Sequence, residues 1–328
     1  MENPHRTHSL FWPIVLIGAG VLLLLRNLEL VPVFNLTMLL RLWPLLLVVL
    51  GLEIIFGRRS PWVGTVIGLL TVAAVAVFLV MSPNLGIPSA EPPQTKVYSA
   101  PLADTDSVTY RISGSADPIF ITKLSNSDEL INASITNRGT MNFDVTGEAE
   151  KTIVLSQASA SDSGLVWDLL EPVQRWDISL SPELPARLVL DGGSGALDVN
   201  LEGLNLTSMT GSFGSGASSI VLPVSTTEYD VELTSGSGAV RIELPESTSL
   251  IISLDSASGA ISIDLPAGAE FRIEVLDDGS GSLSLPPGIS GSASGDETGS
   301  WQSAGYETAA HKILITINNR GSGSISIK

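Results

Sequence analysis

The stretch YDVELTSGSGAVRIELP, residues 229–245, decides the fold. Apolar residues alternate with polar ones on both sides of a Ser-Gly turn, and a Leu-Pro pair closes the unit. An alternation of period two indicates strands with one buried face and one wet face. Proline lacks an amide donor and therefore ends a strand. The stretch thus predicts one unit of strand, glycine turn, strand and proline turn.

The same unit recurs along the last 135 residues of the chain. Ser-Gly pairs recur with glycine spacings of 21, 22, 21, 22 and 42, the last of which equals two periods, at Gly195, Gly216, Gly238, Gly259, Gly281 and Gly323. A fixed period of this length is typical of stacked units. We therefore predict a β-repeat domain over residues 97–328, most regular from 186 to 328.

Two architectures fit this repeat. In a parallel β-solenoid each unit of about 21 residues is one coil, and like positions stack about 4.8 Å apart. Glu243 and Asp264 would then occupy equivalent outward positions on adjacent coils, beside Arg241. In an antiparallel β-sandwich or meander the same strands would pair through their turns. The solenoid is favoured, because a hairpin array needs no constant residue at every other turn.

The front of the chain predicts a membrane region over residues 1–81. Three apolar runs near 9–28, 36–56 and 62–81 are long enough to cross about 30 Å of hydrocarbon. Residues 82–96 are rich in proline and predict an extended linker. Arg6 precedes the first run and Arg58-Arg59 lies between the second and third, so the positive-inside rule predicts a cytoplasmic N-terminus and an extracytoplasmic β domain.

Composition excludes several functions. The chain has a net charge of −17, to which residues 1–90 contribute +2 and residues 91–328 contribute −19. The acidic part argues against nucleic-acid binding, because phosphate contacts need clustered Lys and Arg. It contains no cysteine and three histidines, His5, His8 and His311, so the β domain has no predicted cofactor, metal centre or catalytic residue. Gly192–Asp198 is similar to a calcium-binding GGxGxD repeat, although its Asp comes one place late.

Residues 288–310 interrupt the repeat and carry large aromatic side chains. Trp301 and Tyr306 lie in this glycine-rich segment, with His311 directly after it. Aromatic rings there could stack on sugars of an envelope ligand, or fold back to cover the end of the core. Trp301, Tyr306 and His311 are therefore the predicted ligand-contact residues.

Two segments resemble known families. Residues 9–59, with Trp12-Pro13 repeated as Trp43-Pro44, resemble the LiaI/LiaF-type transmembrane region of bacterial envelope-stress proteins. Trp176–Ile178, Gly192–Gly195 and the later Ser-Gly repeats resemble the adhesin-type domain called a toastrack. The resemblance implies a membrane-anchored, non-enzymatic envelope protein that senses or regulates stress. Relatives in the stress system usually have four spans, which would place the β domain inside the cell.

The expected partners follow from this organisation. They are the lipid bilayer, a membrane protein that contacts the helices, and an envelope polysaccharide or protein that contacts the β domain. A surface adhesin or self-assembling scaffold is the alternative function, with homo-oligomers formed through an exposed final strand, Ser324–Lys328. A carbohydrate-active enzyme is a third, less favoured function.

Overall fold

The computed structural model describes residues 13, 16–18, 20, 47, 51, 66–74, 94–125, 128–137, 139–160, 174–277, 279–294 and 298–328. Residues 66–74 are helical. Within the described residues, no helix is long and apolar enough to cross a bilayer. The predicted spans at 9–28, 36–56 and 62–81, and the predicted linker, lie largely outside the described residues. Pro93–Ser161 and Pro172–Lys328 form one compact unit.

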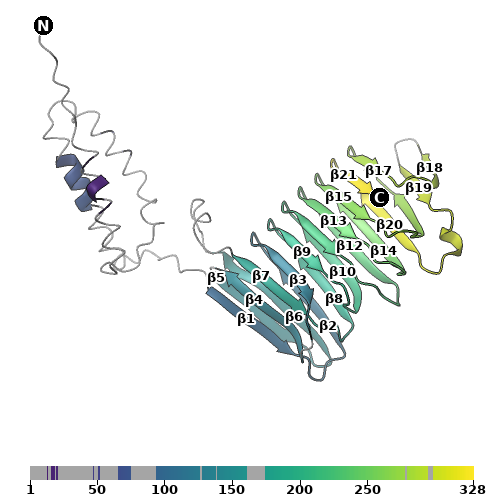
Figure 1. Ribbon diagram of the computed structural model, residues 1–328, viewed down its shortest axis with the longest axis horizontal. Helices are drawn as coiled ribbons and strands as arrows, with labels where there is room; N and C mark the ends of the chain where they lie inside the picture. The colour runs from purple at the N-terminus through teal and green to yellow at the C-terminus, as the bar shows by residue number, and fades with distance from the viewer. Residues whose placement is uncertain are drawn as a thin grey trace, which may run out of the picture. The chain divides into compact units, whose positions relative to one another are not determined.

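This unit contains two facing β-sheets (Figure 1). In spatial order, the first sheet consists of β1 (Gln94–Pro101), β4 (Glu129–Asn137), β7 (Arg175–Leu180), β3 (Ile119–Lys123), β9 (Leu197–Asn200), β11 (Ser218–Val221), β13 (Ala239–Glu243), β15 (Ala260–Asp264), β21 (Ser324–Ile327) and β17 (Ser282–Ser284).

The second sheet, also in spatial order, consists of β18 (Ser290–Ser294), β19 (Thr298–Gln302), β16 (Phe271–Val275), β20 (Ile313–Asn319), β14 (Leu250–Ser256), β12 (Tyr229–Ser235), β10 (Leu206–Phe213), β8 (Ala186–Asp191), β2 (Ser107–Ser113), β6 (Glu150–Ala160) and β5 (Gly139–Thr146). One short 3-10 helix, η3 (Tyr306–Thr308), precedes β20. Successive strands from β8 to β17 alternate between the two sheets, so each repeat contributes one strand to each.

The prediction of an all-β domain is confirmed. The repeat strands pair in parallel, for example Val231 beside Ile252 and Ile242 beside Ile263. Antiparallel pairs occur at the ends, between β1, β4 and β7, between β5 and β6, and among β16, β19 and β18. Both sheets are therefore mixed. Neither a uniformly parallel solenoid nor an antiparallel sandwich describes residues 97–328 as a whole.

The core lies between the sheets and follows the predicted alternation. Val231 and Leu233 of β12 are buried, while Asp230 and Glu232, which alternate with them, are exposed. The same pattern holds in β13 and β14. Each layer thus adds its apolar side chains to one continuous core, whose burial is the main favourable contribution to folding.

The glycines of the Ser-Gly turns are required by close stacking of the layers. A Cβ atom at Gly216 would collide with the carbonyl oxygen of Gly195, and one at Gly238 would collide with that of Gly216. The series continues with Gly259 against Gly238. None of these glycines has a positive φ, so absence of a side chain is the requirement.

The end of the chain does not lie at an edge. β20 inserts between β14 and β16, and β21 inserts between β15 and β17. Gly323 accordingly packs on Gly259, and Gly281 packs on Gly323. The prediction that Ser324–Lys328 forms an exposed edge was wrong, and association through that strand loses its basis. The interval of 42 residues between Gly281 and Gly323 was expected to be two repeats, but it holds β18, β19 and η3 and is not two regular repeats.

Replacing Gly238 by Ala should destabilise the domain by roughly 1–3 kcal/mol, because the new methyl group overpacks the turn against the backbone of Gly216. For a domain of this size, each kcal/mol lowers Tm by about 2–4 °C. Ser237→Ala in the same turn is the matched control, since Ser237 is exposed. Equal Tm values for the two variants in thermal unfolding would contradict the stacking argument.

Candidate binding surface

A pocket forms where the returning strand enters the stack. The chain leaves β15 at Asp264 and must pass over the β20–β21 layer to begin β16 at Phe271. The connection 265–270 therefore separates from the turn below it, and residues 309–312 enter beside it. A cavity of about 340 Å³ lies among these three segments, lined by Pro245, Glu246, Ser247, Thr248, Pro266, Ala267, Gly268, Ala269, Glu270, Ala309, Ala310, His311 and Ile313.

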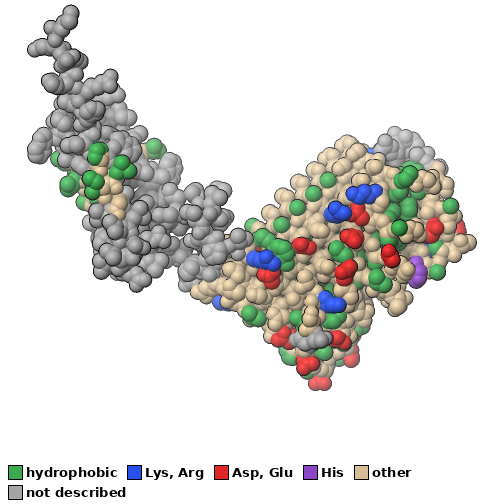
Figure 2. Space-filling model, in the orientation of Figure 1, with side chains coloured by type: hydrophobic (Ala, Val, Ile, Leu, Met, Phe, Trp, Pro, Cys, Tyr) green, Lys and Arg blue, Asp and Glu red, His purple; other side chains and the backbone are tan. Residues whose placement is uncertain are grey.

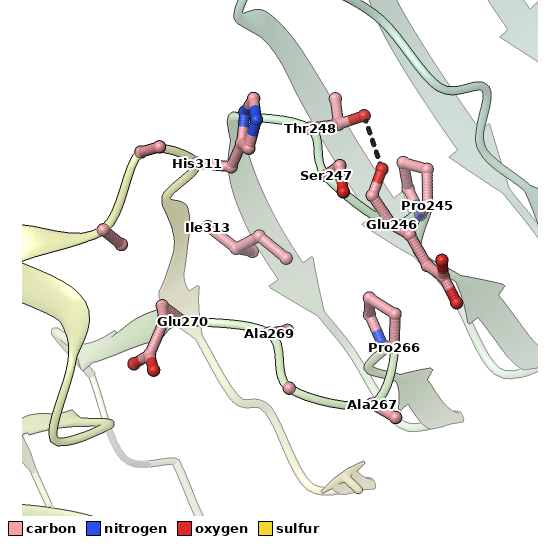
Figure 3. A pocket seen from close by; sticks show the side chains of 13 residues that line it. Pro245, Glu246, Ser247, Thr248, Pro266, Ala267, Ala269, Glu270, His311 and Ile313 are labelled. Carbon is pink, nitrogen blue, oxygen red and sulfur yellow. Dashed lines mark hydrogen bonds between the residues drawn. The ribbon is translucent and has the colours of Figure 1, made fainter.

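The lining mixes small apolar side chains with polar groups. Ile313 lies between the two proline turns, and the carboxylates of Glu246 and Glu270 point away from each other (Figure 3). Thr248 is buried, and its Oγ1 donates to the Glu246 carbonyl oxygen at 3.1 Å while accepting from the Ser225 amide at 3.2 Å. The Thr248 hydroxyl therefore stabilises the turn 245–248 and joins it to Ser225.

Only one of the three predicted ligand-contact residues lines this pocket. His311 is exposed and lies at its rim. Trp301 belongs to β19, where it pairs with Ile273 and packs partly buried against the core. Tyr306 is 8% exposed. The structure therefore places both aromatic side chains where they cover the end of the core, one of the two arrangements expected for this segment.

Two cationic side chains lie over the ring of Tyr306. The Arg272 guanidinium lies 4.5 Å from the ring centroid and the Lys312 Nζ lies 5.4 Å from it. Burial raises the pKa of the Tyr306 hydroxyl, and the Arg272 charge partly opposes that rise. Arg272 also donates to Gln302 Oε1 at 2.8 and 3.0 Å and pairs with Glu307 at 2.5 Å. These contacts fix the segment before β20 to β16.

Glu270 anchors the same segment from the pocket side. Its carboxylate accepts a hydrogen bond from the Gly305 amide at 3.0 Å and a short one from the Ser303 hydroxyl. The Phe271 amide in turn donates to Ser303 Oγ at 3.0 Å. Glu270 could not be identified from the sequence, because its partners Ser303 and Gly305 lie 33 and 35 residues away in the chain. The proline turns were predicted only as strand ends, and nothing in the local sequence places them at a pocket.

The acidic pair on the first sheet has the predicted register. Glu243 lies beside Asp264 on adjacent strands. Asp264 contacts Arg241 at 2.6 Å and Lys328 at 3.4 Å, and the Lys328 contact was not anticipated. Two cations thus balance this carboxylate. Figure 2 shows charged side chains scattered over the visible face, and no group of three or more His, Asp or Glu among the described residues is placed to hold a metal ion.

The serines of the Ser-Gly turns lie at the surface, and their environment is that of ordinary turn residues. Ser194, Ser215, Ser237 and Ser258 are all exposed at one edge of the stack. The Ser322 hydroxyl donates to Ser258 Oγ of the neighbouring layer at 3.2 Å. Such bonds between turns stabilise the layers locally and resemble ordinary turn chemistry.

Replacing Glu270 by Ala should lower the free energy of unfolding by about 1–3 kcal/mol, since the Gly305 amide and the Ser303 hydroxyl lose their acceptor. Glu246→Ala is the control, because the exposed Glu246 side chain lines the same pocket. Denaturant unfolding of both variants checks the expectation. A loss at Glu246 as large as that at Glu270 would contradict the anchoring role.

Comparisons with protein families identify two consecutive domains. Residues 11–92 match the LiaF transmembrane domain. Residues 89–243 match the N-terminal domain of toast_rack, DUF2154. The expected arrangement of the two segments is therefore confirmed. The stacked layers continue to Lys328, beyond the matched range. Comparison with curated proteins finds no match.

Comparison with solved structures finds matches of low sequence identity. A "putative cell adhesion protein" from Clostridium sporogenes has 15% identity and a TM-score of 0.45, covering 72% of this chain and 99% of its own. A "putative adhesin" from Bacteroides fragilis has 12% identity and a TM-score of 0.29, with 74% and 100% coverage. A "putative lipid binding protein" from Parabacteroides distasonis has 16% identity and a TM-score of 0.28, with 71% and 96% coverage.

Proposed function

We propose that this chain, in which a LiaF transmembrane domain is followed by a toast-rack domain, is a membrane-anchored, non-enzymatic envelope protein that senses or regulates envelope stress. The order of the two domains carries the proposal. A membrane region joined directly to a displayed β domain can couple binding outside the bilayer to a partner within it. The helices contact that partner, and the β domain contacts envelope polysaccharide or protein.

The structure of the β domain supports a binding role. Its layers share one continuous core, so a ligand meets a preformed surface and little ordering is needed on binding. The pocket beside His311 offers a mixed lining of small apolar and polar side chains, with an imidazole at the rim. Acid-base chemistry would need a pair of carboxylates that face each other. The carboxylates of Glu246 and Glu270 point away from each other, and the Asp264 carboxylate forms ion pairs with two cations.

Deleting the gene in the native host should change the output of an envelope-stress reporter after treatment with a cell-wall-active antibiotic, and the full chain should restore it. A chain carrying Gly238→Ala should restore it less well than one carrying Ser237→Ala, because only the first disturbs the stacked layers. Attachment of the same cells to surfaces is measured in parallel. An unchanged reporter with lost attachment would favour the adhesin, and release of soluble saccharide from cell wall by the purified chain would favour an enzyme.

We also propose that the β domain lies outside the cytoplasm, on the distribution of arginines around three spans. Single cysteines at Ser89, Ser60 and Asn27 test this cleanly, because the chain has no native cysteine. An impermeant thiol reagent added to whole cells should label Ser89→Cys and Asn27→Cys and leave Ser60→Cys unlabelled until the cells are opened. Labelling of Ser89→Cys only after opening would place the β domain inside the cell.

A further inference from the structure

The two ends of the stack differ in how their edge strands are protected. At the C-terminal end the outermost strands are β17, with three residues, and β18, with five. At the other end they are β1 and β5, with eight residues each. An edge strand exposes backbone groups that can pair with another chain, and short edge strands limit that pairing. The unprotected edges are therefore at the N-terminal end.

β5 is less protected than β1. β1 contains Lys96, ends at Pro101 and follows the Pro92-Pro93 pair, and both residue types discourage pairing at an edge. β5 reads GTMNFDVT, and Asp144 is its one charged residue. It has no proline or lysine, and half of its residues, Thr140, Phe143, Val145 and Thr146, are of types with high strand propensity. β5 is thus the edge best suited to accept another strand.

The apolar side chains of β5 continue the core but are only partly buried. Phe143 pairs with Leu155 and Val145 pairs with Ile153, so these side chains share the face of two fully buried core residues. Phe143 is nevertheless half-buried and Val145 is 38% exposed. The Phe143 ring lies 5.4 Å from the ring of Tyr98. Among the described residues, no strand lies on the outer side of β5. A strand added there would bury this apolar face.

We propose that β5 pairs with the β5 strand of a second copy of this chain, antiparallel, about a twofold axis at Phe143. In this register Met141 lies opposite Val145 of the second copy, on the inner face. Asn142 lies opposite Asp144 of the second copy, on the outer face, so each carboxylate meets an amide. Centring the axis on Asp144 would oppose two carboxylates, which destabilises a strand pair. The strand is therefore complementary to itself in both charge and apolar pattern.

The β5 strand of a second copy is also the pairing partner present at the highest local concentration. The transmembrane domain at residues 11–92 holds all copies in one membrane, which raises their effective concentration. A twofold contact uses the same surface on both copies and closes on itself, so it gives a dimer and no filament. The proposal does not depend on the proposed function.

Disulfide formation in the full chain, reconstituted in bilayers, tests the register. Phe143→Cys should give a covalent dimer on mild oxidation, because residues opposite each other in a strand pair have Cβ atoms about 4.5–5.5 Å apart. Asp144→Cys is the matched control on the same strand, since its two copies would be offset by two residues, about 8 Å apart, too far for a disulfide. No covalent dimer for Phe143→Cys, or equal amounts for both variants, would overturn the proposal.

Mass measurement of the full chain in mild detergent is the second test, and it does not depend on replacing Phe143. The unaltered chain should be a dimer, and Val145→Lys should raise its dissociation constant at least about tenfold, because the new charge lies in the apolar contact. Val97→Lys on β1 is the control, with Val97 64% exposed, and should leave the dimer intact. A monomeric unaltered chain, or equal weakening by both lysines, would overturn the proposal and leave β5 to a strand of another protein.

Discussion

The structure depends on the close approach of successive Ser-Gly turns. Parallel strands lie about 4.8 Å apart, and at this spacing the carbonyl oxygen of one turn occupies the place where a side chain of the next would begin. Gly216, Gly238 and Gly259 meet this constraint by having no Cβ atom. The flanking strands are then held in register, and their alternate apolar residues meet in one core.

The close stacking of Ser-Gly turns also determines where the last two strands of the chain lie. The turn at Gly323 has the Ser-Gly sequence of the other turns and stacks on Gly259, with Gly281 above it. Because this layer enters between two earlier ones, the connection 265–270 passes over it and leaves the pocket beside Ile313. The pocket is thus a consequence of layer order, and the segment fixed by Glu270 leads the returning strand into position.

Local patterns were sufficient to predict the strands of the repeat, the burial of their alternate residues and the pairing of Glu243 with Asp264. They could not predict layer order, since Ser-Gly turns of the same sequence can stack in any order. The position of Ser324–Ile327 inside the sheet depends on contacts with strands that are distant in the sequence. The position of Tyr306 over the end of the core likewise depends on the distant residue Arg272. His311 was predicted as a ligand contact from its residue type and its place in the chain, and it lines the pocket. The prolines that line the same pocket were predicted only as strand ends.

Cross-linking at Ser324 tests the layer order most directly. Ser324 lies beside Ala260 on one side and beside Ser282 on the other. In a chain without native cysteine, the double variants Ser324→Cys with Ala260→Cys and Ser324→Cys with Ser282→Cys should each form an intramolecular disulfide. A bond between Ala260→Cys and Ser282→Cys, with none to Ser324→Cys, would show the last strand outside the stack and contradict the account.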